Sequence, residues 1–383
     1  MKRILVKLLA MSHALVFALA GCAQGSEGIS DSETPAALTA GTEDTSLLDK
    51  SDVETEPTDT DDNKDDTKEE KAPWVFSVER GVSVRDVAID IAGDGEAIEI
   101  IQISDIHYNA INDKDREEND PLVMGSYNDQ TLWLKDGASN ANVLKALKLA
   151  ENADQIVLTG DLISYLSYGN LELLKENLWT PYGDRIMACV GNHDALRCWN
   201  AKTDESDTLE ERIAILQEHW INDVYYSHKI IDERVMLIQM DNAMRSDYNK
   251  FFWDVQVELL RADIELAREK GYAVLLFYHI PLTTMNTKYF STKPASQIGS
   301  GGNINFYTGG VGIAGGAGAD KQIYDIITSS ADVIKATFCG HHHGDYYTEI
   351  KATTPDGTET VIPQYVLTAL PYQSGSITRI TLK

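Results

Sequence analysis

Short apolar runs alternate with longer amphipathic segments along the chain from residue 97 onward. Five runs rich in Ile, Val and Leu have the length of buried strands, at 97–105, 154–161, 185–192, 234–241 and 272–279. Segments with the apolar spacing of helices begin at residues 140, 169, 207 and 253, and the last fifty residues are again strand-like. This alternation predicts an α/β fold whose sheets are covered by helices.

Polar side chains stand at the carboxyl ends of the predicted strands. The groups are Asp105-Ile106-His107, Gly160-Asp161, Gly191-Asn192-His193-Asp194, His279 and Gly340-His341-His342-His343. One such group alone is common turn material. Because ligands of open α/β sheets bind beyond the carboxyl ends of the strands, five groups predict one mouth lined by carboxylate, carboxamide and imidazole. Ligands of these kinds suit Mn, Fe or Zn.

These five groups resemble the motif blocks of the calcineurin-like metallophosphoesterases, in the same order, from about residue 97 to the C-terminus. The resemblance implies a four-layer α/β/β/α sandwich and two divalent metal ions. It also implies hydrolysis of a phosphomonoester or phosphodiester, in which a metal-bound hydroxide attacks phosphorus and the cations offset charge on the attacking and leaving oxygens.

Carried over residue by residue, the resemblance implies seven metal ligands and two catalytic residues. One metal would be held by Asp105, His107 and His343, and the other by Asn192, His279 and His341, with Asp161 bridging the two. His193 would face the phosphate and donate a proton to the leaving oxygen, while Asp194 holds its ring by a hydrogen bond.

The three adjacent histidines then have a simple explanation. Side chains alternate along an extended segment, so His341 and His343 can enter the site while His342 points away from it. For an isolated triplet the alternative is a surface run that binds metal by chance, and the four other groups argue against it. His219 and His228 are interpreted as ordinary surface or packing residues.

The residue three positions after Asp161 separates this chain from the purple acid phosphatases, which resemble the family but have a tyrosine there. Ser164 occupies this position, and Tyr165 follows it. A tyrosinate-bound ferric ion is therefore not implied, and the choice among Mn, Fe and Zn stays open.

Two intervals without clear periodicity are expected to border the mouth. The interval 108–139 is expected to be either a substrate lid containing Tyr127 or Trp133 or a flexible surface insertion. The glycine-rich interval 298–320 matches neither common phosphate-binding fingerprint, so we expect a mobile loop. Substrate contact within it is the alternative, by Asn303, Asn305 or Tyr307.

The N-terminal part of the chain has the features of a bacterial lipoprotein. Residues 1–21 combine a basic start, a short apolar run and a small-residue site, as a secretory signal does. Leu19-Ala20-Gly21-Cys22 resembles a lipobox, so Cys22 is expected to carry the lipid that anchors the protein on the extracytoplasmic side of the cell membrane. The acidic residues 22–72 predict a disordered tether, followed by a catalytic domain at 73–383.

The composition of the chain limits the classes of molecule that it is expected to bind. The 383-residue chain has a formal net charge of −27, which argues against specific nucleic-acid binding, because a polyanion needs a basic surface. We expect phosphoester substrates, either small molecules such as nucleotides or components of the cell envelope. The oligomeric state is left open.

Parts of the sequence are also compatible with two other functions and with a disulfide. A degenerate member of the fold could act as a binding or scaffold lipoprotein, and the tether would equally suit a solute-binding lipoprotein. Neither needs the full set of metal ligands. Beyond Cys22, the cysteines Cys189, Cys198 and Cys339 allow one disulfide at most, and a bridge between Cys189 and Cys198 is conceivable.

Overall fold

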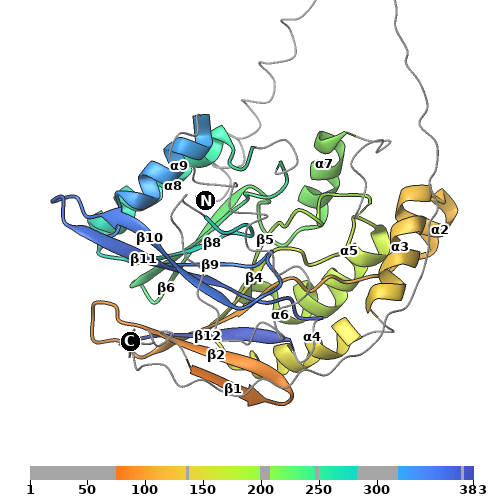
Figure 1. Ribbon diagram of the computed structural model, residues 1–383, viewed down its shortest axis with the longest axis horizontal. Coiled ribbons are helices and arrows are strands. Elements are labelled where there is room, and N and C mark those ends of the chain that lie inside the picture. The colour runs from red at the N-terminus through yellow and green to blue at the C-terminus, as the bar shows by residue number, and fades with distance from the viewer. Residues whose placement is uncertain (1–74, 135–137, 199–207, 246–249, 283–317, 372–374) are drawn as a thin grey trace, which may run out of the picture. The chain divides into compact units, whose positions relative to one another are not determined.

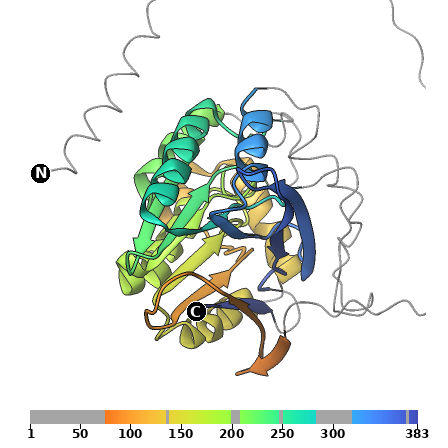
Figure 2. The ribbon, with the colours of Figure 1, turned by 90° about the vertical axis from the view of Figure 1, so that its left-hand side faces the viewer.

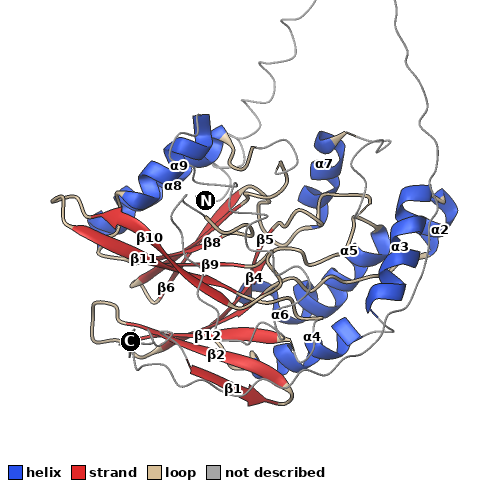
Figure 3. Cartoon of the chain, viewed as in Figure 1, coloured by secondary structure: helices blue, strands red, loops and turns tan. Residues whose placement is uncertain are grey.

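Two six-stranded sheets form the centre of the computed structural model, which describes residues 75–134, 138–198, 208–245, 250–282, 318–371 and 375–383 (Figure 1, Figure 3). The first sheet has the spatial order β1 (Val75–Glu79), β2 (Val82–Ile89), β12 (Ser376–Leu382), β3 (Ile98–Ile103), β4 (Gln155–Thr159), β5 (Ile186–Cys189). The second has the order β10 (Tyr346–Thr353), β11 (Glu359–Val366), β9 (Ile334–Cys339), β8 (Ala273–Phe277), β7 (Val235–Met240), β6 (Tyr226–Ile231).

Each sheet contains a run of neighbouring strands that are parallel. In the first sheet β3, β4 and β5 pair in parallel, and in the second sheet β7, β8 and β9 do so. Parallel neighbours have their carboxyl ends at the same edge of a sheet. The predicted polar groups follow β3, β4, β5, β8 and β9, so the topology gathers them at these edges.

Helices cover the outer faces of the two sheets. The first sheet is covered by α4 (Ala138–Leu149), α5 (Tyr168–Leu174) and α7 (Leu209–His219), and the second by α8 (Asp254–Lys270) and α9 (Gly318–Thr328). A π-helical turn at Lys175–Trp179, the short α6 (Thr180–Tyr182) and a 3₁₀ turn at Gly183–Arg185 lead from α5 to β5. In Figure 2, α8 and α9 lie above the sheets and the yellow α4 lies below them.

Three apolar layers hold the elements together. Leu147 and Leu216 pack helices on the first sheet, and Leu260 packs α8 on the second. The third layer lies between the sheets and includes Ile100, Val157, Leu237 and Phe277. Each fully buried side chain of this kind contributes about 1.5–3 kcal/mol. The predicted four-layer α/β/β/α sandwich is therefore confirmed.

The interval 108–139 differs from the expected irregular connection. Its described part contains α2 (Asp113–Glu118), α3 (Pro121–Leu134) and the first residues of α4. The side chain of Asn112 accepts from the Asp115 N–H and that of Asp115 accepts from the Asn112 N–H, which caps α2. Because α2 is very short and α3 is apolar on several faces, neither shows the period of an amphipathic helix.

Several predicted features lie outside the described residues. They are the leader at 1–21, the tether at 22–72 with Cys22, and Asn303, Asn305 and Tyr307. The interval 298–320 enters the described part only at Gly318, where α9 begins. Of the helices within the described ranges, none has both the length and the apolar character needed to cross a bilayer.

Candidate metal centre

The first group of predicted ligands comes together in the loops that follow β3, β4 and β9. His343 Nε2 lies 3.2 Å from Asp105 Oδ1 and 3.1 Å from His107 Nε2. His107 Nε2 is 3.9 Å from Asp161 Oδ2. Asp105, His107 and Asp161 are almost completely buried, and all four ligand atoms lie within 4.8 Å of one another.

A second group shares Asp161 with the first. His279 Nε2 lies 3.2 Å from Asp161 Oδ2, 3.2 Å from His341 Nδ1 and 3.2 Å from Asn192 Oδ1. Asp161, His279 and His341 again have ligand atoms within 4.8 Å of one another. The structure therefore brings all seven predicted ligands together, divided into the two sets that were expected.

The spacing of these atoms fits a bound cation. Nδ1 of His279 donates to the Thr159 carbonyl oxygen at 2.8 Å, so Nε2 is the nitrogen that carries a lone pair once the ring has lost its second proton. This lone pair faces a carboxylate, an amide oxygen and another imidazole nitrogen, which are groups that repel one another unless a cation lies between them. Ligands about 2.1 Å from a metal at tetrahedral to octahedral angles are about 3.0–3.4 Å apart, which matches the 3.2 Å separations around His279.

Burial and neighbouring charges shift the pKa values of the ligands. Burial would raise the pKa of the Asp161 carboxyl, but His279 and His193 hold it well below its usual value. Burial and the nearby His193 lower the pKa of His107 to about 3. Although burial opposes it, Asp161 raises the pKa of His279 to about 9, so metal binding at His279 must release a proton.

The family model for calcineurin-like phosphoesterases matches residues 98–345, which is more than half of the chain. The chain belongs to the calcineurin-like phosphoesterase family. Its activity is accordingly that of a metal-dependent phosphoesterase, and the donor set described above suits divalent metals.

Solved structures similar to this calcineurin-like phosphoesterase include a dimetal phosphatase from Danio rerio, a putative 5'-nucleotidase from Staphylococcus aureus and the NAD nucleotidase of Haemophilus influenzae. Their sequence identities are 12%, 11% and 15%, and their TM-scores are 0.40, 0.32 and 0.33. The matches cover 72%, 72% and 73% of this chain and 88%, 55% and 46% of the others. A search of curated proteins gives no match.

The ligand-bearing loops of the phosphoesterase use left-handed backbone. The φ angles are 50° at Asp105, 52° at His107, 50° at Asp161, 72° at His341 and 51° at His343. Such conformations are rare for non-glycine residues and persist only where the surroundings enforce them. Residues 341–344 form a bend. The expected extended segment was therefore wrong, and a bend brings His341 and His343 to the site.

Two histidines outside the ligand groups differ in burial. His342 is only 6% exposed, and its ring lies edge-on to Tyr346 with the centroids 6.1 Å apart. His228 lies on the edge strand β6, where its Nδ1 is 2.7 Å from Asp263 Oδ2. His342 is therefore a packing residue, whereas His228 is an exposed residue paired with Asp263, within the surface or packing role expected of it.

His193 lies beside the first ligand group. Its ring is edge-on to that of His107, with the centroids 4.9 Å apart. Its Nδ1 lies 3.0 Å from the Ser164 carbonyl oxygen, and its backbone N–H donates to Asp161 Oδ1 at 2.9 Å. When Nδ1–H donates to Ser164, Nε2 is the nitrogen left for proton exchange with a substrate.

Asp194 does not orient the His193 ring, contrary to expectation. Its Oδ1 accepts from the Ile163 N–H at 2.9 Å, and its Oδ2 accepts from the Gly191 N–H at 2.6 Å. Asp194 thereby joins the loop after β4 to the loop after β5. The ring contact expected of Asp194 is made by the Ser164 carbonyl, which no sequence pattern could indicate because every residue has a carbonyl.

Two glycines allow close approach of neighbouring ligands. A Cβ at Gly191 would lie 2.1 Å from the backbone nitrogen of Asp161, and one at Gly340 would lie 2.2 Å from Asp105 Oδ2. Side-chain atoms do not tolerate such distances. Glycine is therefore required at both positions for the ligands to lie this close together.

Tyr165 is directed away from the ligand groups. Its hydroxyl donates to Asn109 Oδ1 at 2.8 Å. The Asn109 amide in turn donates to Thr131 Oγ1 of α3 at 3.0 Å, and Ser126 of α3 donates to the Arg197 carbonyl at 3.4 Å. The helix α3 is thus packed beside the loop that follows His193.

No disulfide joins Cys189, Cys198 and Cys339, the three cysteines of the described part. Cys189 and Cys339 are fully buried, and Cys189 packs in the apolar layer between the sheets. The conceivable bridge between Cys189 and Cys198 is not formed, because the strand β5 directs Cys189 into that layer.

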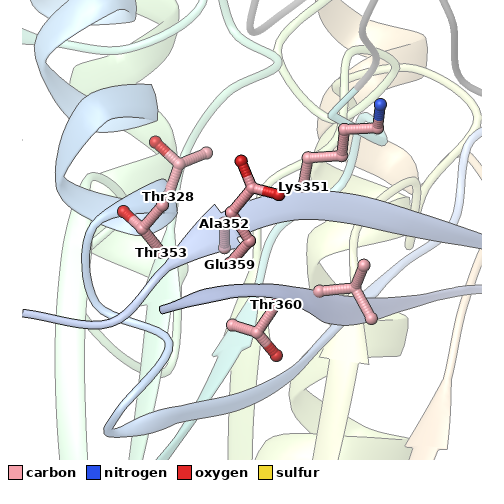
Figure 4. Close-up of a pocket in the computed structure, with 7 residues that line it drawn as sticks. Thr328, Lys351, Ala352, Thr353, Glu359 and Thr360 are labelled. Carbon is pink, nitrogen blue, oxygen red and sulfur yellow. The ribbon is translucent and has the colours of Figure 1, made fainter. Parts of the chain in front are cut away.

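A hollow of about 540 Å³ lies away from the metal ligands, at the far end of β10 and β11 (Figure 4). Thr328, Lys351, Thr353, Glu359 and Thr360 are among its lining residues. From the start of β10 near His343 to Thr353 the strand extends roughly 20 Å or more. The hollow is therefore separate from the centre.

Proposed function

We propose that the enzyme binds two divalent ions and hydrolyses a phosphoester on the extracytoplasmic side of the cell membrane. The two ligand groups that share Asp161 support the number of ions. Asp105, His107 and His343 would hold one ion, and the other would be held by Asn192, His279 and His341.

Divalent ions bound in this way lower the pKa of water towards neutrality and offset negative charge on phosphoryl oxygens. The protein supplies the acid. The Ser164 carbonyl accepts from Nδ1–H of His193, so Nε2 of the protonated ring would be the atom that gives its proton to the leaving oxygen. The second contact of His193, from its backbone N–H to Asp161, fixes its position relative to both ligand groups.

The proposed placement rests on the N-terminal sequence. Residues 1–21 have the features of a secretory signal, and Cys22 ends a lipobox-like motif. On that side of the membrane, phosphorylated small molecules such as nucleotides or phosphodiesters of the envelope are the substrate classes at hand. The net charge of −27 disfavours specific nucleic-acid binding.

The proposed activity is tested with the full-length chain. Hydrolysis of a chromogenic phosphomonoester and of the matching diester is measured with manganese and after chelation, together with the metal content. We expect about two ions per chain and hydrolysis that chelation abolishes. The ester that is hydrolysed faster shows whether the enzyme is a phosphomonoesterase or a phosphodiesterase. A folded, metal-loaded chain that hydrolyses neither would instead favour a binding or scaffold module.

The proposed anchor is tested by labelling with a radioactive fatty acid in a bacterial host. We expect the wild type to be labelled and to fractionate with membranes, and Cys22→Ser to lose both properties. Equal labelling of the two proteins would refute the anchor and leave the proposed activity untouched.

A further inference from the structure

Arg85 is an arginine that is completely buried between the two sheets. It lies on β2, outside residues 98–345, and has 0% exposure. On β2 the side chain of Val84 faces the helices, whereas that of Val87 faces the second sheet. Because side chains alternate along a strand, Arg85 shares the face of Val87. A buried guanidinium is stable only when its donors and its charge are satisfied.

The donors of Arg85 are directed to three strands. Nε and Nη2 donate to Thr378 Oγ1 of β12 at 3.2 and 2.8 Å. Nη1 crosses to the second sheet, where it donates to the Val366 carbonyl at 2.8 Å and the Tyr346 carbonyl at 3.4 Å. The guanidinium carbon also lies 5.5 Å from the centroid of the Tyr365 ring. Arg85 thus joins the two sheets where β10 begins and β11 ends.

Asp345 supplies the charge opposite Arg85. Burial lowers the pKa of Arg85, and the charge of Asp345 acts against this effect. The Asp345 carboxylate, which is 1% exposed, accepts from the Thr368 N–H at 3.1 Å and from Ser376 Oγ at 3.2 Å. Thr368 Oγ1 then donates to the carbonyl of His343 at 2.8 Å.

These contacts end at the bend that carries two metal ligands. His341 and His343 hold left-handed φ angles of 72° and 51°, which the bend cannot maintain by itself. The residue after Asp345 is Tyr346, whose carbonyl Arg85 contacts, so the bend is fixed on its C-terminal side. We propose that Arg85 and Asp345 are positioning residues that hold His341 and His343 in the geometry required for metal binding.

This inference rests on the proposed function, since its readout is the metal centre. The variants are Arg85→Met, Arg85→Lys and Asp345→Asn in the full-length chain. Asp345→Asn keeps the size of the side chain and an acceptor for Thr368 but removes the charge beside Arg85. We measure the dissociation constant for Mn²⁺ or Zn²⁺ by competition with a chelator, and the visible absorption of the cobalt-substituted protein.

Arg379→Met is the matched control. Arg379 lies next to Thr378 on β12 and pairs with Glu79 at 2.8 Å and Asp86 at 3.1 Å, on the opposite face of the strand. Its loss should lower the melting temperature without changing metal affinity or the cobalt spectrum. A role of Arg85 that is only structural would give the same result.

We expect Arg85→Met and Asp345→Asn to weaken metal binding by about tenfold to a hundredfold and to alter the cobalt spectrum, with Arg85→Lys intermediate. Wild-type affinity and spectrum in the folded variants would overturn the inference. If Arg85→Met does not fold, the metal affinity and the cobalt spectrum of Asp345→Asn test the inference. A wild-type chain that binds no metal would overturn the proposed function instead.

Discussion

Replacing Gly191 by alanine should misplace the bridging carboxylate. The added Cβ would lie 2.1 Å from the Asp161 backbone nitrogen and 2.2 Å from its Oδ1, whereas real contacts of Cβ stay beyond 3.0 Å. One of the two loops must therefore move by about 0.9 Å. A misplacement of about 1 Å at a reacting centre can cost about 10²-fold in rate. We expect this loss in kcat, with reduced metal content because Asp161 belongs to both ligand groups.

The assay compares Gly191→Ala with Gly125→Ala. Gly125 lies in α3, and a Cβ there would meet nothing within 4 Å. The control should keep full activity and metal content and gain up to about 1 kcal/mol of stability. Each variant is measured for kcat, bound metal and melting temperature. Wild-type kcat and metal content in Gly191→Ala would refute the reasoning, because the contact would then be relieved without moving the ligand.

Three further outcomes are expected. Asp161→Asn should keep the fold but lose metal and activity, and full activity would exclude a bridging carboxylate. His193→Gln should keep its metal but slow the chemical step by about 10²-fold or more, whereas metal loss would mean that His193 is a ligand. Asp263 raises the pKa of His228, so this pair stabilises the fold below about pH 6.5 and loses that effect as pH rises through the folded pKa. His228→Gln should therefore lower the melting temperature at acidic but not at alkaline pH, and a difference independent of pH would contradict the pairing.

Local patterns in the sequence predicted the elements that build the core. The apolar runs at 97–105 and 272–279 became the buried strands β3 and β8, because their composition and length are those of strands covered on both faces. Elements with weak local patterns were not anticipated. The short α2 depends on the reciprocal capping bonds between Asn112 and Asp115, and α3 has no single apolar stripe.

The ligand set was predictable, but the supporting contacts were not. Asp105, His279 and the other ligands belong to short motifs that can be recognised in the sequence by their residue types and their order. The partner of a buried polar group, in contrast, depends on which groups the fold places next to it. Asp194 was expected to hold the His193 ring, yet its carboxylate joins Ile163 to Gly191.

The sequence by itself determined the ligand types, their order along the chain and the strands that carry them, because periodicity and motif spacing are local properties. Tertiary structure decided which groups meet. Arg85 looks like the polar face of an exposed strand, yet it is buried and bonded to Thr378, 293 residues away. The bend at His341–His343 is likewise enforced by residues distant in sequence. The physical reason is that a buried donor or charge must find its partner among whatever backbone and side chains the packed layers bring near it.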